Sequence, residues 1–241
     1  MAPTFEEMIQ LGEELLSRGW RTFDEVPAAL RDRQRRLTNG DKILGAFLMK
    51  MLSTFEALVD DVRNGRGESM HHLKTLCESY IYLVDALTSE ARASVVLARA
   101  YDGQRRYLEA NDSTDNREKL QRIGLKIGEL TSGQKLDREH IEDVAKRHAN
   151  LASWYDVVYR LACQPAHLGD LEDFFPTDDG VFPEAPGASR SVAAILHGLE
   201  IMVWLASFVN QRNEIGLVID VDDIARRFRG QEGRSEEGGQ V

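Results

Sequence analysis

The stretch that decides the fold runs from residue 41 to residue 62 and reads DKILGAFLMKMLSTFEALVDDV. Its apolar residues recur at steps of three and four positions, the spacing that places them on one face of an α-helix. Turn-forming residues precede it at Thr38 to Asp41 and follow it at Asn64 and Gly65, so a start signal and a stop signal flank the segment. We therefore predict a long helix here, with an apolar face made of Ile43, Leu44, Phe47, Leu48, Met51, Leu52, Phe55, Leu58, Val59 and Val62.

The same helical period continues along most of the chain, and no alternating β-branched run competes with it. We predict an all-α fold, a bundle of long antiparallel helices. The further helices are expected over Ser69–Leu87, Ser89–Tyr107, Arg117–Glu129, Arg138–Cys163 and Ser191–Asn210.

The chain is expected to divide into a bundle with two additions. Residues 1–37 contain two short helices in this interpretation, the second of them basic, and form a surface appendage. Residues 38–229 form the bundle domain, in which residues 168–189 are an acidic loop that contains prolines. Residues 230–241, rich in Gly, Glu and Gln, are predicted to be a disordered tail.

The composition is typical of a globular protein with an acidic surface. The 241 residues include 30 Lys and Arg against 40 Asp and Glu, which gives a formal net charge of −10. Hydrophobic residues make up 42% of the chain, too many for an intrinsically disordered protein. Because duplex binding requires a concentrated basic surface, we expect no DNA partner.

The cysteines and the first residues favour a cytoplasmic protein. Cys77 and Cys163 are too few to build a disulfide-stapled secreted fold of this length. Residues 1–10 carry Glu6 and Glu7 instead of the apolar core of a signal peptide. We therefore expect a reducing, cytoplasmic environment.

The most apolar segment, Ser191–Asn210, approaches the length of a membrane span. His197 and Glu200 interrupt it, however, and both are costly in lipid. We predict the most buried helix of the bundle here and expect no membrane partner.

The helix that ends near Cys163 carries the main candidate for chemistry. At about 100° per residue, Asp156, Arg160 and Cys163 lie opposite its core stripe, which consists of Val144, His148, Leu151, Tyr155, Val158 and Ala162. Pro165 disfavours a continued helix, so His167 is expected at the helix end or in the following loop. An Arg binds phosphate with its planar fork, and a His transfers protons near neutral pH. The alternative is a surface ion pair between Arg160 and Asp156 with a His bonded to a backbone carbonyl.

The helix expected over Ser69–Leu87 offers a second polar face. Lys74, Glu78 and Tyr82 fall away from its apolar stripe. One interpretation is a wall facing the Arg160 helix, with Glu78 orienting Arg160 or His167. The other is a solvated face with a weak pair between Lys74 and Glu78.

Two blocks of the sequence resemble a known family. They are LKTLCESYIYL at residues 73–83 and WYDVVYRLACQPAH at residues 154–167. They are similar to the uncharacterised bacterial helical family DUF5677, in which a basic residue four positions before a Glu opens the first block and a Tyr-rich helix ending in a His forms the second. Lys74 stands where that family more usually has Arg. The resemblance covers roughly residues 43–171 and implies a helical fold without an established activity.

A more distant resemblance is to the HEPN superfamily of helical bundles, which share an Arg, four to six residues, and then a His. Arg160 and His167 have six residues between them, although Leu161 and Pro165 depart from the usual pattern. Many HEPN proteins are dimeric, metal-independent ribonucleases of bacterial defence. The resemblance implies that Arg160 holds an RNA phosphate, that His167 transfers the proton, and that Asp156 or Glu78 orients them.

The sequence leaves a second function open, and with it the question of whether the protein is an enzyme. A non-catalytic helical interaction module, dimeric or bound to a regulator, would use the same face for a protein partner. The acidic loop at residues 168–189 favours this alternative because it repels RNA.

No cofactor or metal is predicted, and a di-metal enzyme is only a third interpretation. Helical di-metal bundles place Glu-x-x-His on two helices, whereas this chain has one reversed copy, His197-x-x-Glu200, whose side chains could simply bond each other. Cys77 and Cys163 lack zinc-ligand spacing. The other histidine groups are His71 with His72, and His140 with Glu139 and Asp143.

Overall fold

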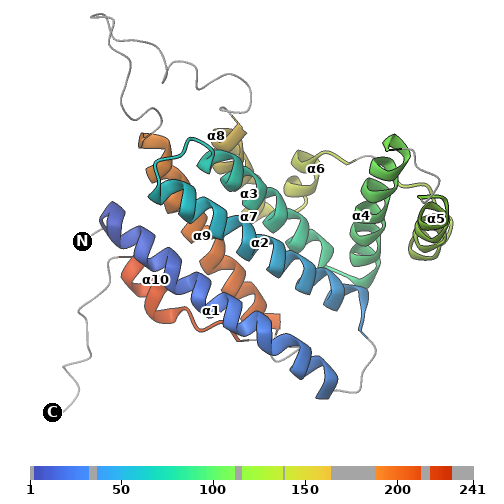
Figure 1. Cartoon of the computed structure of the whole chain (residues 1–241), viewed down its shortest axis with the longest axis horizontal. Helices are drawn as coiled ribbons and strands as arrows, with labels where there is room; N and C mark the ends of the chain where they lie inside the picture. The colour runs from blue at the N-terminus through green and yellow to red at the C-terminus, as the bar shows by residue number, and fades with distance from the viewer. Residues whose placement is uncertain are drawn as a thin grey trace, which may run out of the picture.

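Figure 1 shows the computed structural model of the chain, a bundle of helices. The structure describes residues 3–32, 37–111, 116–137, 139–163, 188–212 and 218–229. Throughout these ranges the regular elements are helices, and none is a strand. The predicted all-α fold class is confirmed.

The centre of the fold is the pair α2 (Asn39–Arg63) and α3 (Ser69–Ala86), which pack side by side. A capping box begins α2: the Thr38 side chain accepts from the Asp41 amide at 3.0 Å, and the Asp41 carboxylate accepts from the Thr38 amide at 2.9 Å. Gly65, with a φ of +64°, forms the turn into α3, a conformation that favours glycine. The apolar face predicted for α2 is confirmed, because nine of its ten residues are buried and Phe47 packs partly buried against them.

The helix α9 (Ala188–Arg212) packs along α2 and α3 and completes the core. Within the described residues it is the one helix long and apolar enough to cross a membrane by length and composition, over Arg190–Gln211. A core helix passes the same test, and 56% of its most apolar window is buried inside the protein. The segment is thus a core helix, but the prediction that it is the most buried one is wrong, because 11 of the 18 residues of α3 are buried.

The helix α4 (Glu90–Ala110) begins at Ser89, whose hydroxyl accepts from the Arg92 amide. It leads to α5 (Arg117–Thr131), which packs on the outer side of α4, away from α2 and α9 (Figure 1). Both helices were expected from the sequence within a few residues of these ends.

The N-terminal helix α1 (Phe5–Asp32) corrects one expectation. It is a single continuous helix rather than two short ones, and it packs against α2, α9 and the short α10 (Asp222–Phe228). Leu11 and Leu15, each 1% exposed, join the main core. The helix is therefore part of the packed bundle rather than a surface appendage, while the domain boundary drawn after residue 37 stays a prediction.

The single helix expected over Arg138–Cys163 is also wrong. The segment instead forms α6 (Ile141–Lys146), α7 (Ala149–Trp154), the π-helix η2 (Tyr155–Tyr159) and α8 (Arg160–Cys163). The chain is extended at His148, with φ −124° and ψ 107°, which ends α6 and sets a new direction for α7. Four residues of the predicted stripe are nevertheless buried: Val144, Leu151, Val158 and Ala162.

Candidate functional site

The two blocks that carry the family resemblance lie against each other. The helix α3 packs on η2 and α8, so residues distant in the sequence are neighbours in the fold. The Tyr159 hydroxyl donates a hydrogen bond of 2.8 Å to Glu78 Oε1 across this contact. Of the polar wall considered from the sequence, Glu78 makes a described contact with this segment, and its partner is Tyr159; the role of the wall toward Arg160 and His167 stays a prediction.

The surroundings of Tyr159 favour the protonated form of its phenol. Burial raises the pKa of Tyr159, and its hydrogen bond to the Glu78 carboxylate raises that pKa further. Burial likewise raises the pKa of the neighbouring Cys77 thiol, which is fully buried. Tyr159 is consequently a fixed donor, and Cys77 is a packing residue rather than a nucleophile.

Arg160 lies at the surface end of the same contact, with 61% of its side chain exposed. Its Nε lies 3.0 Å from Asp156 Oδ1, and one outer nitrogen lies 3.9 Å from Glu142. The guanidinium carbon lies 5.8 Å from the centre of the Tyr155 ring, which stacks on Tyr159 with 4.8 Å between ring centroids. Arg160 is thus oriented by a carboxylate and an aromatic ring while most of its surface faces solvent.

The other predicted site residues are placed as follows. Lys74 makes no ion pair with Glu78 within the described part of the chain, so the weak pair considered from the sequence is not formed there. Glu78 bonds Tyr159 and not Arg160. His167, together with most of the predicted acidic loop, lies outside the described residues. Sequence reasoning missed Tyr155 and Tyr159 as site residues, although their four-residue spacing in the second block was a usable signal.

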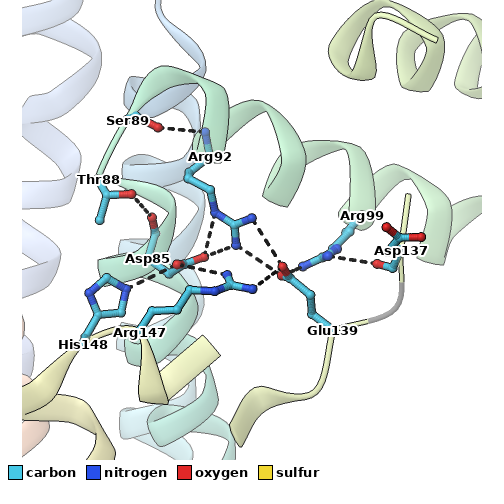
Figure 2. A network of polar contacts seen from close by, with 9 residues as sticks. All are labelled: Asp85, Thr88, Ser89, Arg92, Arg99, Asp137, Glu139, Arg147 and His148. Carbon is cyan, nitrogen blue, oxygen red and sulfur yellow. Dashed lines mark hydrogen bonds and ion pairs between the residues drawn. The ribbon is translucent and has the colours of Figure 1, made fainter. Parts of the chain in front are cut away.

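A second polar cluster, drawn in Figure 2, joins α3, α4 and residues 137–148. Asp85, at the end of α3, has only 3% of its side chain exposed. It accepts from Arg92 Nε at 3.1 Å and from Arg147 at 3.4 Å, and His148 Nε2 lies 3.3 Å away. A buried carboxylate requires such partners, and here they come from two separate segments, α4 and the turn at Arg147 and His148.

Glu139 is the second carboxylate of this cluster (Figure 2). It accepts from Arg92 at 3.2 Å and also from Arg99 and Arg147. Burial alone would raise the pKa of Glu139, but the three guanidinium groups outweigh it and lower the pKa to about 2. The cluster holds the segment that leads to η2 and α8, so it positions Arg160 indirectly. Sequence reasoning missed it, although the spacing of Arg92 and Arg99 places both on one face of α4.

A side-chain pair on α9 and a cleft between α4 and α5 are weaker candidates for a functional site. His197 Nδ1 and Glu200 Oε2 lie 2.9 Å apart on α9, so the reversed di-metal motif is a simple hydrogen-bonded pair, as one interpretation of the sequence expected. An open cleft of about 1050 Å³ lies between α4 and α5. Its charged lining mixes signs, with Lys126 and Lys135 beside Glu129 and Asp137, and so favours no one class of ligand.

Comparison with known proteins supports the family resemblance. A protein-family model described as Family of unknown function (DUF5677) matches residues 41–182, more than half of the chain and a range that contains both blocks. Neither the curated proteins nor the solved structures contain a match to the chain.

Proposed function

The chain belongs to the Family of unknown function (DUF5677), and on this premise we propose that it is a HEPN-like protein that binds and cleaves RNA where the two blocks meet. The observation that supports the proposal most is the exposed Arg160 beside the stacked Tyr155 and Tyr159 rings. A guanidinium binds a phosphate through charge-assisted hydrogen bonds, and aromatic rings stack on unpaired bases. Asp156 holds Nε at 3.0 Å, whereas Glu142 lies 3.9 Å from one outer nitrogen, so a phosphate would bind at the outer edge in place of this longer contact.

Cleavage in this proposal depends on His167, four positions after Cys163. As a general base, His167 takes the proton of a ribose 2′-hydroxyl, and the 2′-oxygen attacks the neighbouring phosphorus. The bond to the 5′-oxygen breaks, that oxygen takes a proton from water, and a cyclic 2′,3′-phosphate remains. Dimeric assembly, a cytoplasmic location and a role in bacterial defence or stress response belong to the same proposal and rest on the HEPN resemblance and the composition.

A non-catalytic interaction module is the second candidate, and a specific observation favours it. Val157 is 64% exposed beside Arg160, and two carboxylates, Asp156 and Glu142, already surround the guanidinium. Arg and aromatic residues are enriched at protein interfaces, so Arg160 beside the Tyr155 ring also fits a protein-binding surface. The partner would be a second copy of the chain or a regulator.

Cleavage of a mixed RNA pool in excess chelator separates the two candidates. We expect cleavage by the wild type and its loss in Arg160→Ala and His167→Ala. Arg122→Ala is the matched control, because Arg122 is also exposed and paired with a carboxylate four positions away, Glu118, but lies on α5. Circular dichroism verifies folding of each variant. No cleavage by the wild type, or cleavage unchanged in all three variants, would exclude the nuclease.

A further inference from the structure

The turn between α2 and α3, at the upper left of Figure 1, brings together three side chains that have no place in the site above. They are Asp61 from the last turn of α2, and Glu68 and His72 from the beginning of α3. One possible ligand atom of each lies within 4.8 Å of the other two. The backbone fixes this arrangement, because the Arg66 amide donates to the Asp61 carbonyl at 2.8 Å and closes the turn.

The side chain of Asp61 gives separate evidence for a bound ligand, beyond the proximity of the three residues. Its side chain is only 7% exposed, and its Oδ2 accepts no hydrogen bond from the described residues. Arg66 Nε lies 3.4 Å from the other oxygen, Oδ1. His72 Nε2 lies 3.0 Å from Oδ2 but is not aligned to donate to it. Two atoms that are close without pointing at each other are what two ligands of one ion would show, since both point at the metal.

We propose that Asp61, Glu68 and His72 bind one divalent transition-metal ion, with Zn²⁺ as the best fit. A neutral imidazole and two carboxylates are ligands that zinc accepts, whereas Mg²⁺ and Ca²⁺ prefer oxygen alone. Tetrahedral ligands at about 2.1 Å from zinc lie about 3.4 Å apart, so His72 and Asp61, at 3.0 Å, separate slightly while Glu68 closes onto them from within 4.8 Å. Glu68 is exposed and free to make that closure, and water takes the fourth position.

The ion would bind the end of α2 to the start of α3, close to the first family block. The sequence predicts no metal site here, because Asp61 is separated from His72 by a turn whose geometry the spacing does not reveal. None of the three ligands belongs to the proposed RNA site. The metal proposal and the RNA proposal can therefore fail separately.

Isothermal titration of chelator-treated, full-length protein with ZnCl₂ tests the site. We expect one equivalent of Zn²⁺ in the wild type and binding about tenfold weaker or more in His72→Ala and Glu68→Gln. His71→Ala is the matched control, because His71 is the exposed neighbour of His72 outside the cluster, and it should bind as the wild type does. Glu68 is exposed, so Glu68→Gln tests the site without disturbing the core.

A titration with Co²⁺ identifies the ligand atoms. We expect weak visible bands of a nitrogen and oxygen site and no thiolate charge-transfer band, which would point to Cys77 or Cys163 instead. Absence of saturable Zn²⁺ binding by the wild type would overturn the proposal and leave Asp61 and His72 as an ion pair. Equal binding by the wild type and both ligand variants, or a thiolate band, would also overturn it.

Discussion

Tyr159 donates a 2.8 Å hydrogen bond to Glu78, and this one contact joins residues 81 positions apart. Each lies in one of the two blocks that carry the family resemblance. The bond fixes η2 against α3 and sets the position from which Arg160 projects, one residue after Tyr159.

Tyr159→Phe removes only the hydroxyl of this contact. We expect the free energy of unfolding to fall by about 1 kcal/mol, because a half-buried acceptor loses its donor. Urea denaturation followed by circular dichroism measures the change. Tyr155→Phe is the control, since Tyr155 stacks on Tyr159 without a hydroxyl hydrogen bond to the described residues. Equal losses in the two variants would show that the bond to Glu78 contributes nothing specific.

The low pKa of Glu139 predicts how stability depends on pH. The pKa is lowered from 4.5 to about 2 in the folded protein, so the folded state binds fewer protons than the unfolded state between these values. The contribution of Glu139 is complete above about pH 4.5 and is lost as the pH falls toward 2. We expect Glu139→Gln to be less stable at pH 7, with the difference from the wild type shrinking toward pH 2. Urea titrations at several pH values measure it, and a difference independent of pH would contradict the assignment.

Asp85 is predicted to be the most costly carboxylate to remove from the cluster in Figure 2. Asp85→Ala leaves Arg92 and Arg147 with Glu139 as their remaining carboxylate and removes the most buried acceptor of the cluster, so it should destabilise the protein by about 1–3 kcal/mol. Glu118→Gln breaks an ion pair whose carboxylate is 84% exposed and should cost less than about 0.5 kcal/mol. Thermal or urea unfolding compares them, and a cost for Asp85→Ala as small as for Glu118→Gln would show that the cluster is not structural.

Two glycines in helices should respond in opposite directions to alanine. A Cβ at Gly19 would overlap Leu52 Cδ2, which is fully buried, so Gly19→Ala should destabilise the contact of α1 with α2 by about 1–3 kcal/mol. A Cβ at Gly103 meets open space on α4, and Gly103→Ala should stabilise by about 0.5–1 kcal/mol. Melting temperatures measure both. Stabilisation by Gly19→Ala would contradict the close approach of the two helices.

The sequence predicted those parts of the fold that local periodicity determines. The helices α2 and α3 have continuous apolar stripes, and their limits were predicted within two residues. The break at His148 was not predicted, because Arg147 and His148 leave the helical path to meet Asp85, more than sixty positions earlier. The periodicity of apolar residues cannot predict contacts between residues this far apart in the sequence.

The candidate site was predicted only where helical periodicity determines it. The polar faces of Glu78 and of Arg160 follow from helical spacing, and so does the pair of Arg160 with Asp156. The bond from Tyr159 to Glu78 depends on the π-helix η2, which has more residues per turn than an α-helix. No pattern in the sequence predicted this π-helix. A helix of uniform pitch would have rotated Tyr159 differently toward α3.

The most direct measurement is the affinity of a labelled single-stranded RNA for the wild type, Arg160→Ala and Arg122→Ala, by fluorescence anisotropy in chelator and low salt. Loss of one charge-assisted phosphate contact corresponds to about tenfold in Kd. We predict saturable binding by the wild type, about tenfold weaker binding by Arg160→Ala, and no change in Arg122→Ala, which loses the same charge elsewhere. No saturable binding by the wild type, or equal affinity in the two variants, would contradict the RNA site.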